Sequence, residues 1–180
     1  MNNLIERLPR YAGLVFIVVA IAMIAKTFSE PPVMGKSAPD FQKVVLAGTG
    51  IGDEVQLSKL RGEVLVLEFW ASWCSACKQS MPMMNEVYGE YGPKGVHFFG
   101  VNTESLGPRR LEQEHERFGM KFGTIQDGDG ALSSLYGVSA IPTVVVIGRD
   151  GVVHFASTGS PRSSKFRNAL DEALSGSNSN

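Results

Sequence analysis

The hydrophobic positions are concentrated first in one unbroken run near the start of the chain. Residues 11–25 are uncharged and mostly apolar, and Arg10 and Lys26 flank them. At about 1.5 Å per residue this run is short for a hydrocarbon core of about 30 Å, but a helix over residues 11–28 nearly spans the core when the Lys26 ammonium extends outward. We therefore expect a retained transmembrane anchor in the lipid bilayer over residues 11–28. A cleaved signal peptide and a buried soluble helix are the alternatives.

Basic residues before this run set its expected orientation. Arg7 and Arg10 precede it, and by the positive-inside rule the N-terminus stays cytoplasmic while the chain beyond residue 28 is exported. The expected location is the cell (inner) membrane, crossed once, with the C-terminal domain in the periplasm or extracytoplasmic space. The predicted organisation is a cytoplasmic N-terminus at 1–10, the anchor or uncleaved signal at 11–28, a proline-bearing linker at 29–36, one domain at 37–175 and a disordered tail at 176–180.

Beyond residue 36, short apolar runs alternate with segments of helical spacing. Residues 64–69, VLVLEF, form a nearly continuous apolar run, which is typical of a central strand covered on both faces. Further strands are predicted at 41–46, 54–57, 96–101, 143–147 and 152–157, and helices at 74–91, 108–118, 131–136 and 163–174. This order predicts an α/β fold with a central mixed sheet flanked by helices.

Composition narrows the classes of function. The chain has 180 residues, enough for one domain with an appendage, and its net charge of −1 with 19% charged residues is typical neither of a nucleic-acid-binding protein nor of a long disordered chain. We expect no nucleic-acid partner. The two cysteines, Cys74 and Cys77, exclude a disulfide-stapled small domain and are too few for a four-cysteine metal site.

The two cysteines have the spacing of a redox pair. Cys74-Ser75-Ala76-Cys77 follows the strand at 64–69 and opens the helix at 74–91. Free N–H groups at a helix start stabilise a thiolate, so Cys74 is the expected nucleophile, and Cys77, one turn later, can attack a mixed disulfide formed at Cys74. Two inert buried cysteines or half of a metal site are the alternatives, although no second pair of ligands lies nearby in the sequence.

The residues around this pair resemble thioredoxin. The resemblance is carried by the segment FWASWCSACK at 69–78, by Pro82 and by Ile141-Pro142-Thr143, while SAPDF at 37–41 and LSKLRG at 57–62 are similar to the membrane-anchored, exported branch of thioredoxin-like proteins, the TlpA/ResA/DsbE type. It covers roughly residues 35–174. It implies a thioredoxin-like fold with an N-terminal β-hairpin and a central αβ insertion.

The resemblance also implies roles for residues outside the pair. Pro142 matches a cis proline that lies against the cysteines, and the Ile141 backbone would pair with a substrate strand. Glu68 occupies the position of a buried acid, whose raised pKa would let it accept the proton of Cys77. Trp73 would form an apolar wall that contacts partners. A trans strand-entry proline and an edge-exposed or otherwise satisfied glutamate are the alternative interpretations.

One position departs from the family pattern. Exported reductases of this type often carry a glutamate three residues after the second cysteine, where this chain has Ser80, and this weighs against a role in cytochrome maturation. The other polar candidates are interpreted as structural: His97, His115 and His154 are scattered over strands and a helix, and Glu112, Glu114 and Glu116 are expected to form a solvated face.

Together these patterns predict a thiol-disulfide oxidoreductase that reduces disulfides in exported proteins with cysteine pairs. The Ser75-Ala76 dipeptide has no histidine to support a strongly oxidising thiolate, which favours reduction of partners. A reductant in an oxidising compartment requires re-reduction, so a membrane electron donor is expected. No cofactor and no metal are expected. The alternative is a dithiol metallochaperone or a redox-linked binding module for copper-site or cytochrome assembly.

Overall fold

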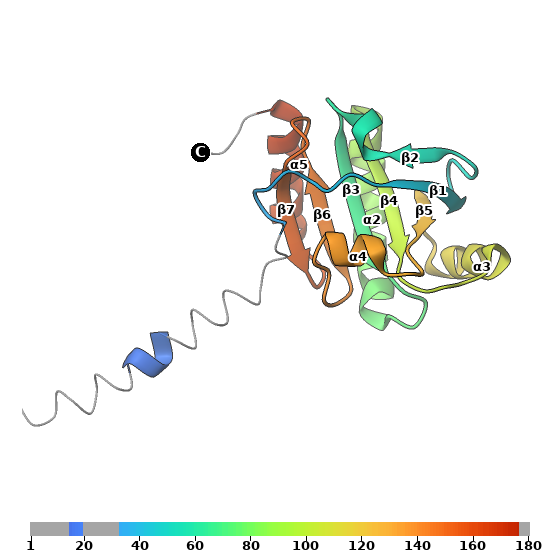
Figure 1. The fold of residues 1–180 in the computed structure, drawn as a ribbon, viewed down its shortest axis with the longest axis horizontal. Helices are drawn as coiled ribbons and strands as arrows, with labels where there is room; N and C mark the ends of the chain where they lie inside the picture. The colour runs from blue at the N-terminus through green and yellow to red at the C-terminus, as the bar shows by residue number, and fades with distance from the viewer. Residues whose placement is uncertain (1–14, 20–32, 177–180) are drawn as a thin grey trace, which may run out of the picture. The chain divides into compact units, whose positions relative to one another are not determined.

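The computed structural model describes residues 15–19 and 33–176 (Figure 1). The chain divides into a first unit, Met1–Glu30, and a second unit, Pro31–Asn180. In the first unit, residues 15–19 are helical and their apolar side chains are exposed. No helix within the described ranges is long and apolar enough to cross a membrane.

Three of the predicted segments fall wholly or mostly on residues that the structure does not describe. These are the N-terminus at 1–10, most of the anchor at 11–28, and all but the first residue of the tail at 176–180. They stay predictions.

The second unit is built on a seven-stranded mixed sheet in the order β2-β1-β5-β4-β3-β6-β7 (Figure 1). Its strands are β1 (Gln42–Ala47), β2 (Glu54–Gln56), β3 (Val64–Trp70), β4 (Val96–Asn102), β5 (Gly123–Gln126), β6 (Thr143–Ile147) and β7 (Val153–Thr158). β3, β4 and β5 run parallel, and the remaining pairs are antiparallel. The predicted α/β fold with a central mixed sheet is therefore confirmed.

β3 and β5 show what a sequence pattern can and cannot predict about a strand. All seven residues of β3, VLVLEFW, are buried, as its apolar run predicts. β5 was not predicted, because its four residues, GTIQ, carry no apolar run. Its position depends on Gly123, where a Cβ atom would come within 2.5 Å of the Thr49 carbonyl oxygen. The backbone of β5 thus packs closely against Thr49 because Gly123 has no side chain, and hydrophobic periodicity does not mark this strand.

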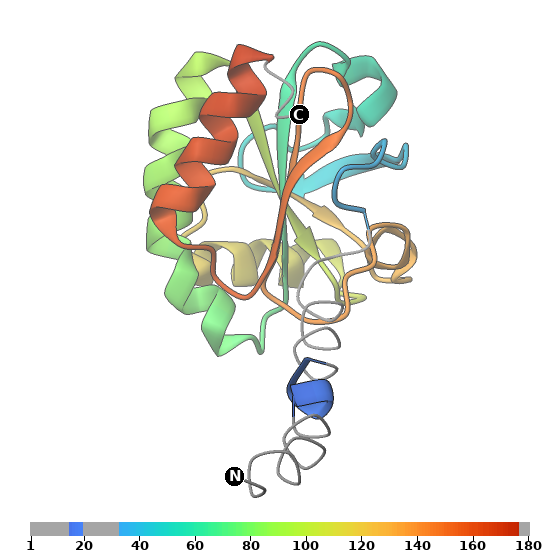
Figure 2. The ribbon, with the colours of Figure 1, turned by 90° about the vertical axis from the view of Figure 1, so that its left-hand side faces the viewer.

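Helices cover both faces of the sheet. The structure confirms the four predicted helices, with bounds α2 (Ser75–Tyr91), α3 (Pro108–Phe118), α4 (Ala131–Leu135) and α5 (Ser163–Ser175). Two short 3₁₀ helices are η1 (Leu57–Leu60), between β2 and β3, and η2 (Gly92–Lys94), between α2 and β4. Figure 2 shows α2 and α5 side by side on one face and α4 on the other. One hydrophobic core lies under α2, α3 and α5, and a second lies between the sheet and α4.

Packed structure begins within the range predicted as a linker. Val33 is buried in the α4-side core, and the Gly35 N–H donates to the Val153 carbonyl at 2.9 Å. The last residues of the 29–36 segment are therefore part of the globular unit, because they bond to the start of β7.

Candidate active site

The cysteine pair lies where β3 gives way to α2. A tight turn follows β3, closed by a hydrogen bond of 3.0 Å from the Cys74 N–H to the Ala71 carbonyl. Cys74 caps the helix, since its Sγ accepts the Cys77 N–H at 3.1 Å. Cys74 and Cys77 form a disulfide with an S–S distance of 2.03 Å. The structure therefore places the pair at the helix start, as the sequence predicts.

The two cysteines differ in their access to solvent and in their position on the helix. Cys77 is fully buried, whereas Cys74 keeps 5% of its surface exposed at the helix N-terminus. The N–H that bonds Cys74 Sγ would also stabilise a thiolate there, and the helix dipole adds to this effect. This asymmetry favours Cys74 as the attacking sulfur.

Glu68 is fully buried in β3, six residues before Cys74. Burial raises its pKa to about 8. Its Oε1 atom receives a long hydrogen bond of 3.4 Å from the Ser80 hydroxyl, and Oε2 has no partner within the described part of the chain. The carboxyl group is thus mostly protonated at pH 7, and its Oε2 atom has no partner among the described residues.

Ser80 connects Glu68 to the backbone of the second cysteine. Its hydroxyl donates to the Cys77 carbonyl at 2.9 Å and also faces Glu68. Ser80 is itself 4% exposed, so this link is screened from bulk water. The sequence marks Ser80 only as a departure from the family pattern, and its contacts emerge from the helical geometry of α2.

The peptide bond between Ile141 and Pro142 is cis, as the resemblance implies. Pro142 is buried and immediately precedes β6, whose first residue, Thr143, pairs with Phe69 of β3. The proline loop is therefore anchored beside the end of the strand that leads to the cysteines.

An uncharged groove includes Trp73, the residue that precedes Cys74. It has a volume of about 490 Å³ and is lined by Trp73, Thr103, Gly130, Ser133, Val138, Ser139, Ala140 and Ile141. The Trp73 side chain is 71% exposed, in contrast to the fully buried Trp70. The structure thus brings Trp73 and Ile141 together on one surface, which offers an apolar wall to a bound chain.

Polar contacts of the turn before Cys74 were not predicted. Ser72 bonds to Glu104, which lies between β4 and α3, and to Arg117 of α3. These partners are separated from Ser72 by 32 and 45 residues, so no local sequence signal marks them.

The solvated acidic face predicted on α3 is wrong at one position. Glu112 and Glu116 are exposed, but Glu114 is only 4% exposed. Its carboxylate pairs with Arg110 at 2.6 Å and with Arg117 at 2.5 Å. Two arginines at helical spacing offset the cost of burying this charge.

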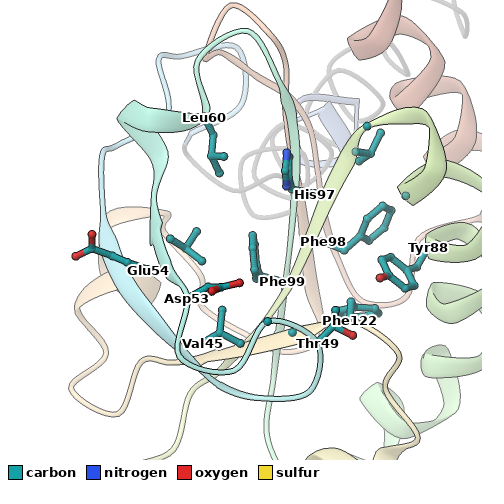
Figure 3. A pocket seen from close by; sticks show the side chains of 16 residues that line it. Val45, Thr49, Asp53, Glu54, Leu60, Tyr88, His97, Phe98, Phe99 and Phe122 are labelled. Atoms are coloured by element: carbon teal, nitrogen blue, oxygen red, sulfur yellow. The ribbon is translucent and has the colours of Figure 1, made fainter.

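A second cavity, of about 410 Å³, lies between β4 and the β1–β2 hairpin (Figure 3). Phe99 and Leu60 line it from one side of the sheet, and Tyr88, Phe98 and Phe122 line it from the other. Its lining includes the first residues of β4, whereas the cysteine pair follows the last residues of the parallel strand β3. This cavity is therefore separate from the dithiol.

The histidines are dispersed, as predicted. His97 pairs with Glu63, His154 contacts Asp150 at 3.0 Å, and His115 contacts Thr124 at 3.0 Å. Among residues 15–19 and 33–176, no group of three or more His, Cys, Asp or Glu side chains is placed to hold a metal ion.

Comparisons with known proteins agree with this geometry. The Redoxin family model matches residues 34–173. The chain belongs to the Redoxin family. It is 34% identical over 140 residues to the thiol-disulfide oxidoreductase ResA of Geobacillus thermodenitrificans, covering 77% of this chain and 76% of the relative. It is 37% identical over 128 residues to ResA of Geobacillus kaustophilus, covering 70% of each.

A solved structure shows the same architecture. The crystal structure from Chlorobium tepidum assigned as the thiol:disulfide interchange protein DsbE superposes with a TM-score of 0.68 at 32% identity, covering 78% of this chain and 97% of that one. The protein is thus a thioredoxin-like protein of the TlpA/ResA/DsbE type. With its cysteine pair at disulfide distance, it is a protein-disulfide oxidoreductase.

Proposed function

We propose that this oxidoreductase reduces disulfides of exported partner proteins, with Cys74 as nucleophile, Cys77 as resolving thiol and Glu68 as proton acceptor. The observation that carries the proposal is the fully buried Glu68, which Ser80 joins to the backbone carbonyl of Cys77, the buried member of a helix-capping cysteine pair. A buried acid next to the resolving cysteine supports a role in taking up the proton of that thiol.

In the first step the Cys74 thiolate attacks one sulfur of the partner disulfide. A new S–S bond forms to the partner, the old one breaks, and the released partner sulfur leaves as a thiolate that takes a proton from solvent. The Cys77 N–H that donates to Cys74 Sγ stabilises the attacking thiolate.

In the second step Cys77 resolves the mixed disulfide. The Cys77 thiol gives its proton to the ionised fraction of Glu68 and attacks Cys74 Sγ, and the partner leaves with its second sulfur reduced. Two electrons have passed to the partner, and the protein is left with the Cys74–Cys77 disulfide that the structure contains. We propose a membrane electron donor as the source of the two electrons that reopen this bond.

The groove beside the pair supports protein partners as substrates. An extended partner segment could pair with the Ile141 backbone before cis-Pro142 while an uncharged side chain packs on Trp73. The apolar run at 11–28, preceded by Arg7 and Arg10, supports membrane anchoring with this groove on the exported side. No observation on the described residues favours a second function.

Trapping tests the proposed roles. In Cys77→Ser, Cys74 still attacks but the mixed disulfide cannot be resolved, so we expect covalent complexes with oxidised exported proteins that a thiol reductant releases. The matched control is Cys74→Ser, which keeps the buried sulfur and should trap little. Equal trapping by the two variants would contradict the assignment of the nucleophile.

A further inference from the structure

The turn between β3 and α2 is held by side chains from another part of the fold. Ser72 and Trp73 are its central residues, between Ala71 and Cys74. All three polar groups of Ser72 are bonded: its N–H and hydroxyl donate to the Glu104 carboxylate at 2.5 and 2.9 Å, and its carbonyl accepts from Arg117 at 2.6 Å. The peptide group before Ser72 thus bonds to an anion, Glu104, and the peptide group after it bonds to a cation, Arg117.

Each charged partner is itself fixed. On one side, the buried Asn102 side chain accepts the Glu104 N–H at 3.1 Å and donates to its carboxylate at 3.4 Å, and Gln126 of β5 donates to the Glu104 carbonyl at 2.9 Å. On the other side, the Arg117 Nε–H donates to buried Glu114 at 2.5 Å, which leaves another N–H of the same guanidinium to reach Ser72. Glu104 and Arg117 therefore connect the turn to β4, β5 and α3.

We propose that Glu104 and Arg117 are positioning residues that clamp Ser72 and thereby fix the direction in which Trp73 and Cys74 face a partner disulfide. Bonds to both the N–H and the carbonyl of one residue restrain both of its peptide planes, and charge-assisted bonds are the strongest available for this purpose. The inference rests on the proposed function only in taking Cys74 as the attacking sulfur.

Positioning and simple electrostatics make different predictions. Removing the Arg117 cation should raise the Cys74 thiol pKa, and removing the Glu104 anion should lower it. A loosened turn, in contrast, should slow attack by the thiolate in both variants. If Glu104 and Arg117 clamp the turn, their two variants should shift the Cys74 pKa in opposite directions, and both should slow attack by the Cys74 thiolate.

The experiment measures mixed-disulfide formation with insulin against pH in the Cys77→Ser background. Cys74 is then the only cysteine, and the profile separates the thiol pKa from the plateau rate of the thiolate. For Arg117→Gln and Glu104→Gln we expect plateau rates about tenfold lower than the parent, less than the roughly 100-fold that a misplacement of about 1 Å can cost. The matched controls are Arg109→Gln and Glu112→Gln, which remove the same charges from exposed positions of α3 and should leave the plateau unchanged.

A second readout follows the turn directly. Insulin has no tryptophan, and Trp70 is buried, so added local motion of Trp73 should appear as lower tryptophan anisotropy in both clamp variants. Arg117→Lys should restore the thiol pKa but the plateau rate only in part, because an ammonium lacks the forked donors that reach Glu114 and Ser72 together.

Plateau rates and anisotropy equal to the parent in both clamp variants would overturn the clamp. If Arg117→Gln fails to fold because Glu114 is left buried with one partner fewer, Glu104→Gln decides by the same criteria. The proposed function is judged separately, because trapping of insulin by the parent Cys77→Ser protein is required whether or not the clamp exists.

Discussion

Glu68 is fully buried in β3 and has no cationic partner among the described residues, which is unusual for a carboxyl group. Desolvation raises its pKa to about 8, and the long bond from Ser80 offsets only part of that effect. At neutral pH most molecules therefore carry Glu68 as the acid and a minority as the carboxylate. The minority form is the one that can take a proton from Cys77.

The pH dependence of resolution follows from this titration. In the wild type, the rate of resolution should rise as pH increases through about 8, because the fraction of Glu68 carboxylate rises. Glu68→Gln keeps the shape but cannot accept the proton, so resolution near neutral pH should slow about tenfold or more while the initial attack is unchanged. Stopped-flow tryptophan fluorescence can resolve the two steps. If both steps match the wild type, Glu68 is only structural.

The same carboxyl group also makes stability depend on pH. Its folded-state pKa of about 8 lies above its ordinary value of 4.5, so the folded protein holds this proton more tightly than the unfolded chain. Its contribution is fully present below pH 4.5 and is lost as pH rises toward 8. Oxidised Glu68→Gln should therefore gain stability relative to the wild type over this range, by up to about 1.4 kcal/mol per pH unit.

Urea unfolding at several pH values measures this difference. Glu112→Gln, which removes an exposed carboxyl group, is the matched control and should track the wild type. If the free energy of unfolding of Glu68→Gln runs parallel to that of the wild type between pH 5 and 8, Glu68 is not buried as the neutral acid.

Which site residues the sequence could reveal depends on where their partners lie. Cys74, Cys77, Glu68 and Pro142 fall within or beside recognisable local motifs, and the structure places them at one end of the sheet. The partners of Ser72 come from segments 32 and 45 residues away, so only the completed fold brings them together.

At the scale of elements, the site depends on how closely β3, β4 and β5 pack. Gly100 of β4 pairs with Glu68 of β3 and with Thr124 of β5. A Cβ atom at Gly100 would lie 2.5 Å from Met120 Cε and 2.9 Å from Trp70 Nε1. The lack of a side chain here leaves room for the indole of Trp70, which lies on the same strand as Glu68.

Gly100→Ala should accordingly destabilise the protein by about 1 to 3 kcal/mol, because the neighbours must move to admit a methyl group. Denaturant midpoints with an unchanged slope would measure the loss. Gly89→Ala is the matched control: in α2 a Cβ atom meets nothing within 4 Å, and alanine in a helix should stabilise by about 0.5 to 1 kcal/mol. Similar midpoints for the two variants would contradict the tight packing.

Whether an element could be predicted depends on how strong its local sequence pattern is. The helix at 108–118 and the strand at 143–147 occur with the predicted bounds, because Pro108 opens the charged helix and a continuous apolar run defines the strand. β5 was missed because its four residues belong to the sheet through neighbours on both sides rather than through their own pattern.

At the scale of the whole molecule, parallel β3 and β4 end at the same edge of the sheet, and the reactive groups gather there. β3 leads into the Cys74 turn, β4 leads to Glu104, and β6 begins after the cis proline. The α2 N-terminus faces the same place with its N–H groups. The direction of electron flow then depends on how strongly this assembly stabilises the Cys74 thiolate over the disulfide.

Helix-end stabilisation alone predicts a reductant. Going from about −270 mV, the potential of thioredoxin, to about −120 mV, that of a strong oxidant, takes roughly 7 kcal/mol, more than a helix terminus supplies. Ser75 and Ala76 are uncharged and exposed, so they add no cation. Equilibration with glutathione buffers should give a potential below about −180 mV, and a higher value would reverse the proposed direction.

Ala76→His tests the same reasoning by adding a cation next to the Cys74 sulfur. A thiolate stabilised by about 1 kcal/mol raises the potential by about 20 mV, since 30 mV corresponds to about 1.4 kcal/mol for this two-electron couple. Because histidine is charged mainly below its ordinary pKa of about 6.5, the difference from the wild type should be larger at pH 6 than at pH 8. Ala76→Gln, polar but uncharged, should leave the potential unchanged. A rise of equal size in both variants would assign the effect to the bulk of the side chain and remove the electrostatic basis for the predicted direction.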